Sequence, residues 1–174
     1  GYNYYADIDS NLMDDVRIGI QTNYYQKPAN TSTDALIRSN EAHASAVGIY
    51  FHYFDPGSSP FTVSDNQIFA NANPNQTGLW NGLMVSTFYG DTLGYVENND
   101  IDGTALAGSG RSRAGYLAVL IATTQADHLI IDGGSVSNVD DGVLVTDGAY
   151  FAGPVNNITV QNVDFSNITR AAFH

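Results

Sequence analysis

A short pattern that recurs six times along the chain constrains the fold more than any other feature of the sequence. Two alternating apolar or small residues lead to a corner position, and a further apolar residue follows it. The copies are Ala6, Ile8, Asn11, Met13; Ala35, Ile37, Asn40, Ala42; Phe61, Val63, Asn66, Ile68; Gly94, Val96, Asn99, Ile101; Leu129, Ile131, Gly134, Val136; and Ile158, Val160, Val163, Phe165. The corner position recurs about every 30 residues, the length of one supersecondary unit. We therefore expect a solenoid in which each copy forms one coil.

A second pattern follows each copy, in which a Gly opens another apolar segment. These positions are Gly19, Gly48, Gly82, Gly115 and Gly142, and Ala171 takes this place in the sixth copy. In copies three and four the Gly comes about eight residues later than in the others, which indicates two insertions, near residues 71–79 and 102–112. Because these copies are adjacent, the insertions should rise side by side from neighbouring coils.

The apolar residues of each copy alternate with period two and are rich in Val and Ile, while Gly, Asn and Asp lie between the runs. This patterning predicts short strands joined by tight turns rather than helices. Asn at a fixed corner tolerates the left-handed backbone conformation, and stacked Asn side chains can form hydrogen bonds from coil to coil. The sequence therefore predicts an all-β parallel solenoid with an Asn ladder at one corner.

This layout resembles the right-handed parallel β-helix of the pectin-lyase-like superfamily, over essentially the whole chain. The resemblance implies one all-β domain, a right-handed single-stranded parallel β-helix over residues 1–174, with six coils near 1–30, 31–58, 59–90, 91–124, 125–153 and 154–174. The first half of each unit also resembles a leucine-rich repeat, but Leu is a minority at the apolar sites and no copy contains a helix-forming return segment. Because no cap is visible at either end, we expect a slice of a longer solenoid or a subunit whose open ends are covered by neighbours.

Charge and composition indicate which classes of partner the chain can bind and in which compartment it is found. With 18 acidic and 6 basic residues the net charge is −12, which argues against a nucleic-acid partner. No apolar run approaches the roughly 20 residues that span a bilayer, so no transmembrane segment is expected. The absence of Cys leaves the compartment open, but four Asn-x-Ser/Thr sequons favour an extracellular or cell-surface protein, although an Asn-rich β-protein also generates such tripeptides by chance. The sequons are at Asn30, Asn75, Asn157 and Asn167.

Stacked coils bring equivalent residues about 4.8 Å apart, which places two charge pairs beside the repeat Gly. Two residues before the Gly the expected stack is Trp80, Arg113, Asp140 and Thr169, and one residue before it the stack is Asn81, Ala114, Asp141 and Arg170. Asp140 would then lie beside Arg113, and Asp141 beside Arg170. Such a cluster is typical either of an ion-pair ladder on a solenoid surface or of a polysaccharide site, here next to the two insertions.

In the polysaccharide hypothesis Trp80 stacks on a sugar face, and Arg113 and Arg170 bind the substrate. Asp140, Asp141 and Arg113 would carry the acid and base chemistry of a polysaccharide lyase or glycoside hydrolase. Catalysis is the alternative hypothesis, because the sequence favours a protein without enzyme activity.

Two short motifs bear on this alternative. The segment Asn138-Val139-Asp140-Asp141-Gly142 resembles the Asp-Asp motif of polygalacturonases of the same superfamily. The Asn-Thr-Asp, Gly-His-Gly and Arg-Ile-Lys motifs that those enzymes also need do not occur in the sequence. The Tyr-Phe-Asp-Pro segment at residues 53–56 resembles the Asp-Pro motif of mannuronan epimerases, but Gly57 stands where a His should follow.

Residues two positions after the repeat Gly should point outward, and they are apolar in four consecutive coils. They are Tyr50, Met84, Leu117 and Leu144. A contiguous apolar stripe predicts an interface, because such patches are usually covered. The cover is expected to be another chain or another part of the parent protein, or else a local loop at residues 24–34 or 86–92.

The sequence predicts no cofactor and no transition-metal site. The four His residues fall at non-equivalent positions of different coils: His43, His52, His128 and His174. Acidic residues in or near expected turns suit Ca²⁺, although such turns are more commonly only solvated; they are Asp14 with Asp15, Asp100 with Asp102, and Asp147.

The sequence favours a structural function, in which a secreted, acidic β-helix associates through its open coil ends and its apolar outer stripe as a fibre, stalk, filament or adhesin. Its partners would be further copies of itself or other parts of the same parent chain. The alternative is a polysaccharide-active enzyme or carbohydrate-binding module, and a tailspike would combine both. Fold alone does not choose between these classes.

Overall fold

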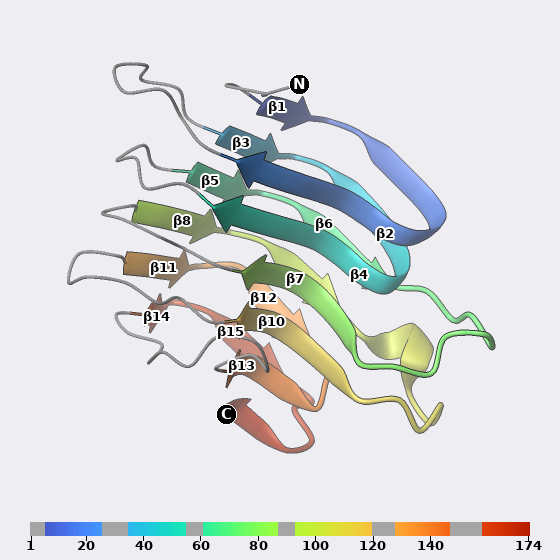
Figure 1. The fold of residues 1–174 in the computed structure, drawn as a ribbon. Helices are drawn as coiled ribbons and strands as arrows, with labels where there is room; N and C mark the ends of the chain where they lie inside the picture. The colour runs from blue at the N-terminus through green and yellow to red at the C-terminus, as the bar shows by residue number, and fades with distance from the viewer. Residues whose placement is uncertain (1–5, 26–34, 55–60, 87–92, 120–127, 147–157) are drawn as a thin grey trace, which may run out of the picture.

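The computed structural model describes residues 6–25, 35–54, 61–86, 93–119, 128–146 and 158–174. Figure 1 shows an all-β solenoid whose strands stack in parallel from the N-terminal to the C-terminal end. The first sheet has six strands, one from each repeat. They are β1 (Ala6–Asp9), β3 (Ala35–Arg38), β5 (Phe61–Ser64), β8 (Leu93–Glu97), β11 (His128–Asp132) and β14 (Ile158–Gln161). The expected all-β parallel solenoid is confirmed.

The second sheet has ten strands and forms two sides of the coil, because the long strand β4 pairs with both β6 and β7. Its strands are β2 (Leu12–Tyr25), β4 (Glu41–Phe54), β6 (Gln67–Ala70), β7 (Trp80–Ser86), β9 (Asp100–Asp102), β10 (Arg113–Val119), β12 (Ser135–Ser137), β13 (Asp141–Thr146), β15 (Asp164–Ser166) and β16 (Ala171–Phe173). A short 3-10 helix, η1 (Thr104–Leu106), lies in the second insertion.

The described strands correspond to about four turns of solenoid, fewer than the six coils expected, although each repeat does supply one strand to the first sheet. A turn is complete only with the segment that returns from the second sheet to the first. The five return segments, residues 26–34, 55–60, 87–92, 120–127 and 147–157, lie outside the described residues.

Each coil turns from the first sheet to the second at a residue in the left-handed backbone conformation. This residue directly precedes the corner position in every repeat, and its φ angle lies between 51° and 70°. The six residues are Ser10, Ser39, Asp65, Asn98, Gly133 and Asn162. Gly and short polar residues adopt this conformation at low energetic cost. The same bend at the same place in every coil lets the strands stack in register.

The corner Asn residues form the ladder that the sequence predicts, and Asn66 shows its pattern. The Oδ1 atom of Asn66 accepts hydrogen bonds from the backbone N–H and the Nδ2 group of Asn40, both at 3.0 Å. Its Nδ2 group donates to Oδ1 of Asn99 at 2.8 Å and to the Ile37 carbonyl at 3.1 Å. Asn40, Asn66 and Asn99 are buried, so these bonds satisfy polar groups that water does not reach.

The repeat glycines lie where the second sheet bends and leaves no room for a side chain. A Cβ atom on Gly82 would collide with Cγ2 of Ile101 and would lie 2.8 Å from the Gly115 carbonyl oxygen. Gly48 and Gly115 face the same obstruction one coil away on either side. The recurring Gly is therefore needed for close approach of neighbouring coils.

The sixth repeat is shifted by one residue from the alignment expected from the sequence. Asp141 pairs with Ala171 and Val143 with Phe173, so Ala172 rather than Ala171 lies opposite Gly142. The Asp140 carbonyl accepts hydrogen bonds from both Arg170 N–H at 2.8 Å and Ala171 N–H at 3.1 Å. Two amides that share one carbonyl mark an extra residue in the strand, as in a β-bulge.

Replacing Asn66 by Ala should lower the free energy of unfolding by about 3 kcal/mol, because the partners of its side chain stay buried and lose their hydrogen bonds. Denaturant unfolding followed by circular dichroism measures the change. Asn75→Ala is the matched control, since Asn75 is exposed in the first insertion. Equal stability of the two variants would contradict a stabilising ladder.

Gly82→Ala should destabilise the protein by about 2 kcal/mol, since the added methyl group overpacks the bend. Gly78→Ala is the control, because it makes the same substitution at a position where an added Cβ would meet no atom within 4 Å. The unfolding midpoint of Gly78→Ala should therefore stay close to that of the unmodified protein. Thermal unfolding of both variants tests the contrast, and a Gly82→Ala protein as stable as Gly78→Ala would refute the packing argument.

Candidate functional site

The stacking expected beside the repeat Gly is present, and it brings Arg113 against Asp140. Arg113 in β10 lies opposite Trp80 in β7. The backbone N–H of Arg113 donates to Oδ2 of Asp140 at 2.8 Å. Its Nη2 group donates to Oδ1 of Asp140 at 3.0 Å, and the Thr169 hydroxyl donates to the same oxygen at 2.6 Å. Asp140 is thus held from the coil before it and the coil after it.

The second expected pair, Asp141 with Arg170, is also present despite the register shift. Nε of Arg170 donates to Oδ1 of Asp141 at 2.8 Å, and Nη2 of Arg170 forms a short ion pair with Oδ2. His174 Nδ1 lies 3.2 Å from Oδ1 of Asp141. The side chain of Asp141 is 0% exposed, whereas that of Arg170 is 49% exposed. We name Arg113, Asp140, Asp141, Thr169, Arg170 and His174 the Asp–Arg cluster.

Trp80 lies in the core and has no exposed ring face. The residue is 0% exposed, and its indole N–H donates to the Ala44 carbonyl of the preceding coil at 3.0 Å. The ring therefore fills the interior at the bend of the second sheet. This placement corrects the expectation that Trp80 offers a platform for a sugar.

The electrostatics of Asp140 suit a permanent charge. Burial disfavours its ionised form, but hydrogen bonds from Thr169 and Arg113, together with the Arg113 charge, outweigh burial and lower the pKa of Asp140. A general acid at neutral pH needs the opposite shift. Asp140 therefore suits an ion pair between coils better than a general acid, and the fully buried Asp141 is shielded from solvent.

The outward row occupies the register expected from the sequence, since Tyr50, Met84, Leu117 and Leu144 are successive partners. Leu117 is only 6% exposed, and the other three are half-buried. The expected covering loops, residues 24–34 and 86–92, lie for the most part outside the described residues. The row is therefore less exposed than an open apolar stripe would be.

A polar group next to this row was not singled out from the sequence. Nδ1 of His52 lies 2.7 Å from the Ser86 hydroxyl and 3.2 Å from the Tyr50 hydroxyl. Burial lowers the pKa of His52, so the imidazole is neutral at pH 7. Ser86 is 3% exposed, which leaves its hydroxyl enclosed. The signal was present in the sequence, because His52 and Ser86 hold equivalent positions four residues after the repeat Gly.

Residues of the two insertions line a pocket, and its lining includes none of Trp80, Arg113, Asp140 and Asp141, around which the polysaccharide site was expected. Its volume is about 430 Å³. The lining residues are Ala72, Asn73, Pro74, Gln76, Thr77, Leu106, Ser109, Gly110 and Arg111. Arg111 was not among the predicted site residues, because an insertion interrupts the repeat by which the other residues were aligned.

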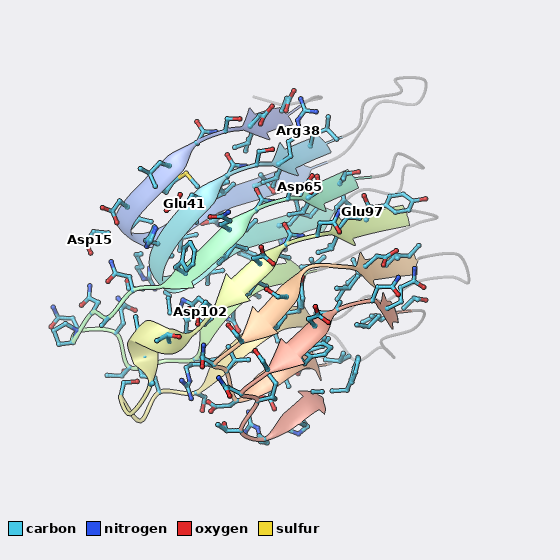
Figure 2. The ribbon with its side chains drawn as sticks, turned by 180° about the vertical axis from the view of Figure 1, so that it is seen from behind. Asp15, Arg38, Glu41, Asp65, Glu97 and Asp102 are labelled. Carbon is cyan, nitrogen blue, oxygen red and sulfur yellow. The ribbon has the colours of Figure 1, made fainter. Side chains whose placement is uncertain are left out.

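Three of the acidic residues suggested for Ca²⁺, Asp15, Asp100 and Asp102, accept hydrogen bonds from side chains. Asp102, labelled in Figure 2, accepts from Thr104, Ser137 and Asn138, which lowers its pKa against the effect of burial. Oδ1 of Asp100 accepts from the Ser135 hydroxyl at 2.7 Å. Across the described part of the chain, no group of three or more His, Asp or Glu side chains is placed to hold a metal ion, and Asp147 and the placement of the His128 side chain are not described.

Comparisons with protein-family models, with curated proteins and with solved structures gave no significant match to this chain. The resemblance to the pectin-lyase-like superfamily is therefore supported only at the level of a parallel β-solenoid. Among the described residues, no helix has the length and apolar character needed to cross a membrane.

Asp140→Asn should lower stability by about 2 kcal/mol at pH 7, because it weakens charge-assisted hydrogen bonds. The pKa of Asp140 is lowered by folding, so its contribution is present above the unfolded-state pKa of about 3.9 and is lost as the pH falls through the folded-state value. The stability gap between Asp140→Asn and the unmodified protein should therefore narrow from pH 7 to pH 3. Denaturant unfolding at both pH values tests this, with exposed Asp65→Asn as control.

Proposed function

We propose that this protein is a structural β-solenoid that associates end to end by adding parallel strands to its terminal coils. The supporting observation is the burial of one inward-facing row along the first sheet. Its central members are at most 1% exposed, whereas its first and last members, Ile8 and Val160, are only partly buried. The row is Ile8, Ile37, Val63, Val96, Ile131 and Val160.

The described ends of the solenoid combine this apolar cross-section with strand edges. In the first sheet β1 and β14 are the edge strands, and in the second sheet β15 and β16 are at the ends of the strand order. Phe173 in β16 continues the inward row of Val143, which is 0% exposed, yet Phe173 is 57% exposed. Free strand edges next to an apolar surface are templates for further pairing.

The charges on the sides of the solenoid also favour end-to-end over side-by-side association. Figure 2 shows Arg38, Asp65 and Glu97 near one another on one side of the solenoid and Asp15 on the other side, and Arg38 pairs with Asp7 and Asp9. With a net charge of −12, lateral approach of two copies is opposed by repulsion, whereas the inward-facing residues of the end strands are apolar. The proposed partner is therefore another coil, from a second copy or from another part of the parent chain.

A fibre, stalk, filament or adhesin segment outside the cell fits this proposal. The sequon residues Asn75 and Asn167 are exposed, so both are accessible to glycosylation. The other two sequons, at Asn30 and Asn157, fall outside the described residues. Mass spectrometry of the protein from a eukaryotic secretion host tests their use.

A polysaccharide-active enzyme is less well supported, because Trp80 and Asp141 are buried and Asp140 is neutralised by Arg113. Turnover of an acidic polysaccharide that disappears in folded Asp140→Asn would favour the enzyme over the structural role. This measurement keeps the two classes distinguishable.

Association is tested with Phe173→Asp, which places a charge on the exposed C-terminal end of the core. Light scattering and electron microscopy over a range of concentrations should show end-to-end oligomers of the unmodified protein, with association at least about tenfold weaker in Phe173→Asp, because the charge must be desolvated. Leu144→Asp tests the outer stripe separately, and Ala105→Asp, exposed in η1, is the charge control. An unmodified protein that stays dispersed as single copies at all concentrations would overturn self-association.

A further inference from the structure

The pocket between the insertions is built by segments that lie outside the repeated strand pattern. Residues 71–79 connect β6 to β7, and residues 103–112 connect β9 to β10. Figure 1 shows both connections extending beyond the same edge of the solenoid, side by side. The backbone N–H of Trp80 donates to the Ser112 carbonyl at 2.9 Å, which joins the two segments at their base.

Hydrogen bonds within each segment hold the pocket walls in place. Oδ1 of Asn73 accepts from the backbone N–H of Asn75 at 2.9 Å, and the Asn73 carbonyl accepts from Gln76 N–H at 3.0 Å. On the other wall, the Ser109 hydroxyl donates to the Leu106 carbonyl at 2.7 Å and accepts from Arg111 N–H at 3.2 Å. The pocket is thus pre-formed, as small-molecule sites usually are.

Arg111 is the only charged residue among those that line the pocket. Its Nε group donates to the Gly78 carbonyl at 3.0 Å, which fixes the guanidinium across the gap between the two segments. Its Nη1 atom is buried, and within the described part of the chain it has no hydrogen-bond partner. Burial also lowers the pKa of Arg111, which indicates that its charge is poorly solvated.

This arginine differs from three of the other four arginines in the sequence. Arg38, Arg113 and Arg170 each form an ion pair with a carboxylate on a neighbouring coil. No such ion pair is formed by Arg111 with the described carboxylates. The chain has three times as many acidic as basic residues, yet this partly buried arginine has no carboxylate partner among the residues that the structure describes. An anion bound beside it would offset the cost of desolvating its charge.

We propose that the pocket binds a small organic monocarboxylate. With Nε held by Gly78 and Nη1 buried, Nη2 is the guanidinium nitrogen that pairs with a carboxylate. Ala72, Pro74 and Leu106 supply apolar lining for the body of the ligand, and Gln76 and Thr77 are polar residues of the same lining. Its volume of about 430 Å³ falls in the usual range for a small-molecule site.

The charge of the ligand follows from the charge around it. One guanidinium balances one negative charge, and the net charge of −12 opposes any further negative charge. A monoanion is therefore preferred over a phosphate dianion. This site is separate from the coil ends, so ligand binding here does not depend on the end-to-end association proposed above.

Three probes of similar size separate the contribution of the ligand's charge to binding from that of its aromatic ring: benzoate, neutral benzamide and dianionic phenyl phosphate. Ligand-observed NMR and calorimetry on the full chain should show benzoate binding at least about tenfold more tightly than either of the others, because only benzoate matches one guanidinium. Amide shifts at Gly78, Gly108 and Gly110 should report the bound site. Equal binding of benzamide would refute the guanidinium as the recognition element, and tighter binding of phenyl phosphate would refute the preference for a monoanion.

Arg111→Gln should weaken benzoate binding at least about tenfold, whereas Arg17→Gln, which removes the same charge from an exposed position on β2, should leave it unchanged. Gln76→Glu provides a second test that keeps the Arg111–Gly78 hydrogen bond, because it adds a competing carboxylate to the pocket without changing shape. Gln21→Glu, exposed on the outer face, is its control. Unaltered binding in folded Gln76→Glu, or no benzoate binding to the unmodified protein, would overturn the proposal.

Discussion

The left-handed corner and the buried Asn that follows it are the constraint on which the rest of the structure depends. A solenoid can stack strands in register only if every coil bends at the same place by the same angle. One residue with positive φ sets the bend, and the Asn side chain then ties that bend to the next coil through its Oδ1 and Nδ2 atoms. Each coil therefore fixes the position of its neighbour, and the strands follow from the corner.

The last coils replace the Asn ladder with ionised groups. At Gly134 the ladder has no side chain to continue it, and the Asn99 backbone occupies the space. Beyond this point Asp132 accepts from Gln161 at 2.7 Å and from Asn162 at 2.8 Å, and the Asp–Arg cluster joins the same coils at the other corner. Carboxylates thus add to the contacts between the C-terminal coils, so acidification should weaken these contacts.

The repeat was enough to predict the parallel sheets, the ladder and both charge pairs, because all three depend only on which residues hold equivalent positions. It did not predict the burial of Trp80, since the period-two alternation of a flat strand does not hold where β4 bends and Ala44 presents its carbonyl inward. The one-residue shift in the sixth coil was missed for a similar reason, as the Asp140 carbonyl shared by two amides leaves no trace in the apolar pattern. Arg111 was missed because an insertion has no equivalent in the other coils to align it with.

The same argument identifies where this fold has freedom to acquire specific chemistry. A residue in a repeated position is committed to stacking: Asn66 must pair with Asn99, Gly82 must leave room for Ile101, and Arg113 must neutralise Asp140. The insertions obey none of these requirements, yet they are anchored at Trp80 and Gly103 by hydrogen bonds to neighbouring coils. A segment that is rigidly anchored but free of the repeat can hold an unpaired charge such as Arg111 in a fixed place, which is what recognition of a small ligand requires.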